Sequence, residues 1–219
     1  MRAILNDRYG PPEGLRLDEI DPPVIGDDGI LVRVRASSVN ALDWHAMRGK
    51  PYLVRAQEGL RRPSTRIPGV DIAGVVEAVG SAVTAVRPGD EVMAHRGGAW
   101  AELVACTERH VVPKPAGLSF EEVAAVPVAA MTALQGLRDK GGVTTGSRVL
   151  ITGAGGGVGT FAVQIARALG GEVTATTRSD NVDLVRSLGA AHVIDYTRED
   201  VTEGAARFDV ILDIAATSP

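Results

Sequence analysis

The stretch Thr152-Gly-Ala-Gly-Gly-Gly-Val-Gly159 decides the fold. It follows an apolar segment at 147–152, typical of a short buried strand, and precedes a segment at 158–169 with apolar residues at helical spacing. Backbone N–H groups and the dipole at a helix N-terminus attract a diphosphate, and glycines let it approach. The stretch therefore predicts a dinucleotide-binding turn; a merely glycine-rich strand–helix turn is the alternative.

The glycines of this turn do not follow the strict G-x-G-x-x-G pattern. Two looser alignments are possible: Ala154-x-Gly156-x-x-Gly159, with alanine at the first position, or Gly153, Gly156 and Gly159 at three-residue spacing. Gly156 and Gly157 are predicted to let the backbone reach the phosphates, and Gly159 to let the helix pack on the strand.

Strands and helices alternate after the turn. Further strands are predicted at 172–176, 191–194 and 208–214, with a helix at 180–188. Such alternation predicts parallel strands joined by right-handed crossovers. The usual dinucleotide fold has about six strands in the order 3-2-1-4-5-6, and only about four precede the last residues. We expect a C-terminally truncated sheet with an unpaired edge.

The first half of the chain is predicted to be β-rich. Strand patterns cover 30–36, 70–79 and 91–94, and Arg87-Pro-Gly-Asp90 has the composition of a turn. Ser119 and Glu122 then have capping-box spacing, which predicts a helix that Pro127 divides and Gly141-Gly142 ends. We place the boundary between two domains, 1–118 and 119–219, before this helix.

Composition excludes several classes of protein. Net charge is −4, aromatics make up 4% of the 219 residues, and no block of basic residues occurs, so neither a nucleic-acid nor a membrane partner is expected. The lone Cys106 excludes an internal disulfide. The N-terminus has no signal-peptide pattern, and the expected location is cytoplasmic.

Charge at the end of the second strand after the turn indicates which dinucleotide is bound. An NAD site places a carboxylate there, whereas this strand ends Thr176-Thr177-Arg178-Ser179. A cation and hydroxyls suit the 2′-phosphate of NADP(H). Arg178 as a solvated surface residue is the alternative. Asp180, with Asp183 three residues later, is interpreted as a helix N-cap.

Six landmarks, in this order, carry a resemblance that extends over nearly the whole chain. They are residues 39–44 (Val-Asn-Ala-Leu-Asp-Trp), 68–76, 87–92, 97–102 (Gly-Gly-Ala-Trp-Ala-Glu), 131–134 (Met-Thr-Ala-Leu) and 153–159. Together they resemble the quinone oxidoreductase (enoyl reductase-type) branch of the medium-chain dehydrogenase/reductase superfamily. The resemblance implies an α/β chain: a GroES-like β-rich catalytic domain, then a Rossmann domain, which here would be incomplete.

The resemblance also implies roles for individual residues. Asn40 and Thr132 would lie near the nicotinamide, and the backbone of Gly156, Gly157 and Val158 would hold the diphosphate. The groups around the adenine ribose and its phosphate would be Thr177, Arg178 and Tyr196. For Tyr196, a half-buried residue after a strand is an equal alternative. Members of the family form homodimers through sheet that follows residue 219, so dimerisation is doubtful here.

Zinc is not expected. Zinc-dependent relatives carry Gly-His-Glu where this chain has Gly69-Val70-Asp71, and residues 39–44 include no cysteine. The four histidines show no ligand-like spacing and are interpreted as surface or loop residues: His45, His95, His110 and His192.

Hydride transfer from NADPH to a quinone or an α,β-unsaturated carbonyl is the reaction that these features imply. Such a reaction needs a proton donor, and Tyr52 in Arg48-Gly-Lys-Pro-Tyr52 is the candidate. A loop aromatic packed on the β domain is the alternative for Tyr52. The alternative function is a non-catalytic, nucleotide-binding remnant of such an enzyme.

Overall fold

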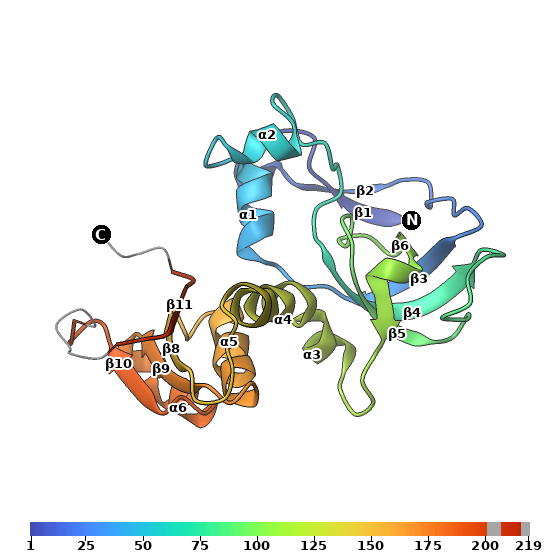
Figure 1. Ribbon diagram of the computed structural model, residues 1–219. Helices are drawn as coiled ribbons and strands as arrows, with labels where there is room; N and C mark the ends of the chain where they lie inside the picture. The colour runs from blue at the N-terminus through green and yellow to red at the C-terminus, as the bar shows by residue number, and fades with distance from the viewer. Residues whose placement is uncertain (201–206, 216–219) are drawn as a thin grey trace. The chain divides into compact units, whose positions relative to one another are not determined.

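The computed structural model describes residues 1–200 and 207–215 (Figure 1). The chain divides into two compact units, Met1–Val128 and Ala129–Pro219, and each is described by itself. The last residues, 216–219, where the sequence predicts that the sheet is cut short, lie outside the described part of the chain.

The first unit is built on an antiparallel sheet of five strands in the order β6-β3-β4-β5-β7. A separate pair, β1-β2, is also antiparallel. Branched residues such as Ile30, Ile72 and Val92 alternate into a shared core under the five-stranded sheet. The strand bounds are β1 (Arg2–Leu5), β2 (Arg16–Glu19), β3 (Gly29–Ala36), β4 (Asp71–Val79), β5 (Glu91–His95), β6 (Leu103–Thr107) and β7 (Val111–Pro113). The three strands predicted in this half are confirmed.

Short helices border this sheet. They are η1 (Pro12–Gly14), α1 (Ala41–Arg48), α2 (Val54–Glu58), η2 (Glu108–His110) and α3 (Phe120–Ala124). The predicted capping box is confirmed at α3: Glu122 N donates to Ser119 Oγ (3.1 Å), and Ser119 N donates to Glu122 Oε2 (2.8 Å). Val123 and Ala124 pack against β3 and β4, so α3 belongs with the first unit although the predicted boundary at residue 118 precedes it.

The second unit contains a four-stranded sheet in the order β10-β9-β8-β11, with every neighbouring pair parallel. In chain order this is 3-2-1-4, so the predicted doubly wound arrangement is confirmed for these strands. The bounds are α4 (Pro127–Leu134), the π-helical η3 (Gln135–Lys140), β8 (Arg148–Thr152), α5 (Gly157–Ala168), β9 (Glu172–Thr177), η4 (Ser179–Asn181), α6 (Val182–Ser187), β10 (His192–Asp195) and β11 (Val210–Asp213). Buried Val149, Ile151 and Ala162 lie in one core that joins β8 to α5.

The predicted N-cap at Asp180 is wrong. The chain makes a 3₁₀ turn over Ser179–Asn181 before α6 begins, and Asn181 occupies the N-cap position. Ser179 is tied to Asp195 of the neighbouring strand by a hydrogen bond of 2.5 Å, so a long-range contact sets this turn.

Candidate active site

The glycine turn joins β8 to α5 with little space around it. Gly153 has φ +66°, a left-handed conformation that suits glycine. A Cβ on Gly159 would lie 2.3 Å from Gly153 O and 2.6 Å from Ala154 Cα, so the first turn of α5 rests on the backbone of the loop. This is the close helix packing that the sequence predicted for Gly159.

Gly155 is a further required glycine that the sequence reasoning did not single out. A Cβ there would lie 2.6 Å from Asn181 Nδ2 and 2.7 Å from Thr177 Oγ1. The glycine run in the sequence includes Gly155, but the need for glycine at this position could not be seen there. The side chains that crowd it come from β9 and η4, which follow later in the chain.

The start of α5 is open toward a ligand. Gly156 is the N-cap in extended conformation, and a Cβ on Gly157 would meet nothing within 4 Å. The N–H groups of Gly157, Val158 and Gly159 have no acceptor within the described residues, as expected for the first turn of a helix. An open space in front of unpaired N–H groups fits a diphosphate.

The end of β9 brings together two of the residues predicted to surround the adenine ribose. Tyr196 N donates to Thr177 O (3.1 Å), and Thr177 itself is buried. The Tyr196 side chain is 53% exposed, and Arg178 is exposed at the N-cap of η4. Within the described residues the Arg178 guanidinium has no ion-pair partner. Arg178 thus offers an uncommitted cation next to the turn.

Asp195, at the end of β10, is the carboxylate of this region. It accepts from Ser179 Oγ (2.5 Å) and from Thr197 Oγ1 (2.7 Å). These hydroxyls, Ser179 first, hold the pKa of Asp195 below its ordinary value. The carboxylate is therefore ionised and already engaged, and it withdraws the Ser179 hydroxyl from the set of groups free to bind a phosphate.

In the first unit, Asn40 belongs to a buried polar cluster around Asp71. Asn40 Nδ2 donates to Asp71 Oδ2 (2.9 Å) and to Ser38 Oγ (3.1 Å), and Ser38 Oγ donates to the same Asp71 oxygen (2.7 Å). Asp71 Oδ1 accepts from Val128 N (3.0 Å) in the first turn of α4. The amide of Asn40 is thereby fixed in orientation.

A second buried carboxylate, Asp43, holds the start of α1. Asn40 N donates to Asp43 Oδ2 (2.7 Å), and burial is the main reason why the pKa of Asp43 is raised, with the charge of Asp71 adding to it. Asp43 also borders a cavity of about 80 Å³ that Gly69 and Val70 help to line. The spacing of Asn40 and Asp43, a capping pair, was a signal for α1 that the sequence reasoning missed.

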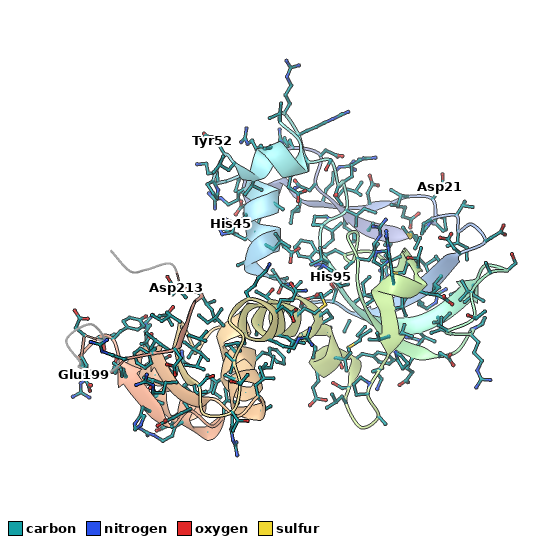
Figure 2. All side chains as sticks on the ribbon, viewed as in Figure 1. Asp21, His45, Tyr52, His95, Glu199 and Asp213 are labelled. Atoms are coloured by element: carbon teal, nitrogen blue, oxygen red, sulfur yellow. The ribbon has the colours of Figure 1, made fainter. Side chains whose placement is uncertain are left out.

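Tyr52 and Asn40 are not brought together, because they flank opposite ends of α1 (Ala41–Arg48). Tyr52 is 71% exposed and its ring lies under Arg55, with the guanidinium carbon 5.0 Å from the ring centre. Figure 2 shows Tyr52 beside α2 and well separated from His95. Thr132, the other residue expected near the nicotinamide, is exposed on α4.

The histidines do not all fit the expected surface or loop positions. His45 and His192 are exposed, but His110 is half-buried in η2 with Thr107 Oγ1 3.0 Å from its Nδ1. His95 ends β5 and has a buried Nδ1, because β5 pairs with β4 and places it against Asp71. Within the described ranges no three His, Cys, Asp or Glu side chains are grouped so as to hold a metal ion.

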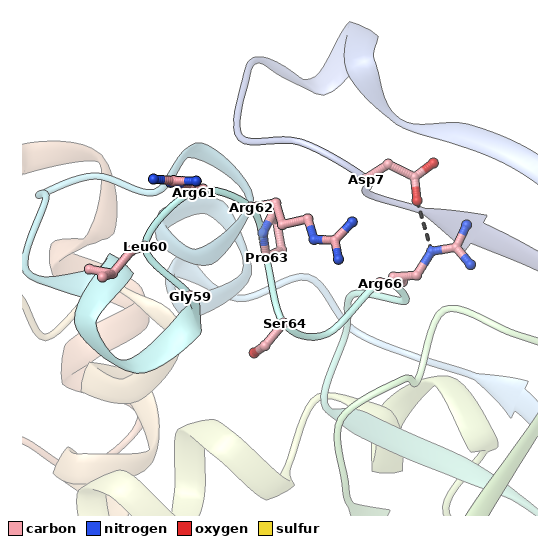
Figure 3. Close-up of a pocket in the computed structure, with 8 residues that line it drawn as sticks. All are labelled: Asp7, Gly59, Leu60, Arg61, Arg62, Pro63, Ser64 and Arg66. Carbon is pink, nitrogen blue, oxygen red and sulfur yellow. Dashed lines mark hydrogen bonds and ion pairs between the residues drawn. The ribbon is translucent and has the colours of Figure 1, made fainter.

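A larger cavity, of about 760 Å³, lies away from these residues on the loop after α2. Arg61, Arg62 and Arg66 line it, and Arg66 Nε donates to Asp7 Oδ1 (2.8 Å; Figure 3). None of the predicted site residues lines this cavity. In the described part of the chain, no helix is long and apolar enough to cross a bilayer.

A β-rich unit followed by a parallel sheet with a glycine turn at its first crossover is the order of domains expected of a medium-chain dehydrogenase/reductase. Residues 26–116 match the family "Alcohol dehydrogenase GroES-like domain", and residues 157–219 match the family "Zinc-binding dehydrogenase".

Known relatives narrow the class. The chain is 37% identical to the quinone oxidoreductase QR1 of Triphysaria versicolor, over 100% of this chain and 69% of the relative. It is 34% identical to an NADPH-dependent alkenal/one oxidoreductase of Arabidopsis thaliana, over 97% and 57% of the two chains. The structure of a quinone oxidoreductase from Coxiella burnetii matches with a TM-score of 0.87 at 33% identity, covering 98% of this chain and 68% of that one.

The chain therefore belongs to the quinone oxidoreductase branch of the medium-chain dehydrogenase/reductase superfamily, a family of oxidoreductases. It spans 56% to 69% of the length of the curated relatives it matches.

Proposed function

We propose that this chain belongs to an NADPH-dependent oxidoreductase that transfers hydride to a quinone or an α,β-unsaturated carbonyl without zinc. The observation that carries the proposal is the open first turn of α5, where the N–H groups of Gly157, Val158 and Gly159 lack acceptors within the described residues. These groups would hold the diphosphate, with Gly153 and Gly156 shaping the turn.

The preference for NADPH rests on the end of β9. Arg178 is exposed and uncommitted within the described residues, and Thr177 lies beneath it. A guanidinium would bind the 2′-phosphate with paired, charge-assisted hydrogen bonds. Asp195 faces the same region, but its oxygens accept from Ser179 and Thr197. Tyr196 would flank the adenosine from the next strand.

The bound nicotinamide would supply the hydride. Residues of the chain would bind and orient the cofactor and the substrate, and would supply a proton to the reduced substrate. Asn40, fixed by Asp71 and Ser38, would present its amide to the nicotinamide end, together with Thr132. Val70 has no atom that could ligate a metal, which supports a reaction without zinc. Without a Lewis acid, a conjugated acceptor is favoured because its own conjugation spreads the developing negative charge. From the sequence, Tyr52 stays the candidate proton donor.

Relatives named for quinone and alkenal/one reduction support a small, conjugated substrate. The net charge of −4 and the absence of a basic block support an enzyme without a nucleic-acid partner. The lone Cys106 suits a reducing compartment, so the proposed location is cytoplasmic.

The test is oxidation of NADPH by the purified chain in the presence of a small quinone or a linear enone, followed by nicotinamide absorbance. Turnover that persists after dialysis against a strong zinc chelator is the expected result. Tight binding of NADPH without turnover of either substrate would instead favour a nucleotide-binding chain that does no chemistry. Turnover lost on chelation and restored by zinc would refute the zinc-free reaction.

A further inference from the structure

One buried carboxylate in the first unit holds groups from several separate segments. Asp71 is fully buried, and its Oδ2 accepts from Ser38 and Asn40 while its Oδ1 accepts from Val128 N. A buried carboxylate that accepts several hydrogen bonds is held in one orientation. The cluster therefore fixes one carboxylate directly behind Asn40.

His95 faces the same carboxylate from β5. Its Nδ1 lies 3.6 Å from Asp71 Oδ1, because Asp71 and His95 are paired in the register of β4 and β5. Across the described residues, this Nδ1 is the one buried side-chain nitrogen or oxygen without a hydrogen-bond partner. The side chain as a whole is 41% exposed, so the other edge of the ring reaches solvent.

These two facts distinguish His95 from an ordinary surface histidine. A buried imidazole nitrogen without a partner is costly unless it carries a proton toward a nearby acceptor. Asp71 is that acceptor, and a small closure of the 3.6 Å gap would complete a charge-assisted hydrogen bond. When the ring takes up a second proton, that proton would be on Nε2, which would then be the accessible N–H of the imidazolium.

We propose that Asp71 and His95, in place of Tyr52, form the proton-delivery pair of the reduction, with His95 Nε2 as the donor and Asp71 as the positioning residue. This rests on the proposed function. Asp71 would hold the donor and Asn40 through the two oxygens of one carboxylate.

Proton transfer from His95 would complete the reduction of both an enone and a quinone. Hydride addition to the β-carbon of an enone breaks the carbon–carbon π bond and leaves an enolate. The Nε2–H bond of the His95 imidazolium then breaks, its proton bonds to the α-carbon, and the imidazole becomes neutral. With a quinone, hydride addition leaves a hydroquinone monoanion, whose oxygen takes the same proton. His95 regains a proton from solvent at its exposed edge.

Other charged or titratable groups lie near Asp71 and His95. Asp43 lies on the Asp71 side, where the charge of Asp71 helps to raise its pKa. Arg96 follows His95 in the chain, and the pKa of His110 is lowered by burial first, then by Arg96, Arg109 and His95. The strand β7 adds only Val111, Val112 and Pro113 opposite β5. The Asp71 carboxylate lies 3.6 Å from the ring nitrogen of His95.

The experiment compares His95→Gln, Asp71→Asn and Tyr52→Phe with the wild-type chain, and uses His192→Gln as the control for loss of an exposed histidine. Readouts are the pH profile of kcat, the affinity for NADPH, and the positions of the histidine ring-proton resonances by NMR. The chain has four histidines, so the His95 signal is assigned by its loss in His95→Gln.

The proposal predicts that His95→Gln lowers kcat on the order of 100-fold or more and removes the limb of the pH profile that reports the acid. NADPH affinity and the far-UV spectrum should stay unchanged. Asp71→Asn should displace the His95 ring-proton resonances, because it removes the carboxylate that lies 3.6 Å from Nδ1. His192→Gln should behave as wild type.

Retention of kcat and of the acid limb in His95→Gln, with their loss in Tyr52→Phe, would overturn the assignment in favour of Tyr52. His95 ring resonances that Asp71→Asn leaves unmoved in a folded chain would overturn the pairing. If Asp71→Asn does not fold, Asp71→Glu takes its place, and His95 ring resonances that it leaves unmoved would overturn the pairing equally. A wild type that binds NADPH and reduces neither substrate would refute the proposed function, whereas the NMR result would still decide the pairing.

Discussion

Gly159 packs directly on the turn that it follows: a Cβ at this position would lie 2.3 Å from the Gly153 carbonyl oxygen. Backbone atoms cannot yield as the end of a flexible side chain can, so this contact fixes how closely α5 approaches β8. Gly157, two residues earlier, faces open space. One glycine is thus required for packing, and the other is free to serve a ligand.

Substitution of these two glycines should separate stability from binding. Gly159→Ala should destabilise the chain by roughly 1–3 kcal/mol, because the added methyl forces the helix away from the turn. Gly157→Ala should leave the melting temperature unchanged or slightly raised, and should weaken NADPH binding because its methyl occupies the approach to the N–H groups. Thermal unfolding and fluorescence titration measure the two effects, and equal melting temperatures would contradict the packing role of Gly159.

Arg178→Glu should weaken the binding of NADPH on the order of 10- to 100-fold, the usual effect of losing a hydrogen bond to a charged group. Binding of NADH should change little, because NADH lacks the 2′-phosphate. Arg186→Glu is the matched control, since Arg186 is an exposed arginine on α6 that pairs with Asp183. A similar loss for both dinucleotides would contradict the assignment of Arg178 to the 2′-phosphate.

Asp195 should contribute to stability in a pH-dependent way. Its pKa is lowered in the folded chain, chiefly by the Ser179 and Thr197 hydroxyls, so its contribution is present above the unfolded value of 3.8. It is lost as the pH falls through the lowered folded pKa. Wild type should therefore be more stable than Asp195→Asn in urea at neutral pH, and the difference should shrink on acidification. Asp183→Asn, at a fully exposed side chain, should show no such difference.

Cys106 should be unreactive in the folded chain. It is buried in β6, and burial raises the pKa of its thiol to about 11. Because the thiolate is the reactive form, a thiol reagent at pH 8 should modify the native chain slowly and the urea-unfolded chain at once. Rapid modification of the native chain would show that β6 opens readily from the sheet.

Local patterns sufficed to predict the parallel sheet and its glycine turn. The apolar run before Gly153, the helical spacing after it and the Ser119–Glu122 capping box each depend on residues close in sequence. The strand order then follows from the handedness of short crossovers. The strands β3, β4 and β5 could also be predicted from local patterns. Their register could not, because it depends on pairing between residues that are distant in sequence.

The polar cluster around Asp71 could not be predicted, because its partners come from distant parts of the chain. His95 meets Asp71 only through the pairing of β4 with β5, and Val128 lies 57 residues from Asp71 in sequence. Asp180 failed as an N-cap for a similar reason, since Ser179 is held by Asp195 on another strand. Helix α1 was missed although Asn40 and Asp43 carried a capping signal.

The most direct test of the central claim is a titration of the 219-residue chain with NADPH and NADH in parallel, followed by nicotinamide fluorescence. The N–H groups at the start of α5 should give saturable binding of both dinucleotides, with NADPH bound at least about 10-fold more tightly through Arg178. A folded chain that binds neither dinucleotide would contradict the claim that this turn holds a diphosphate.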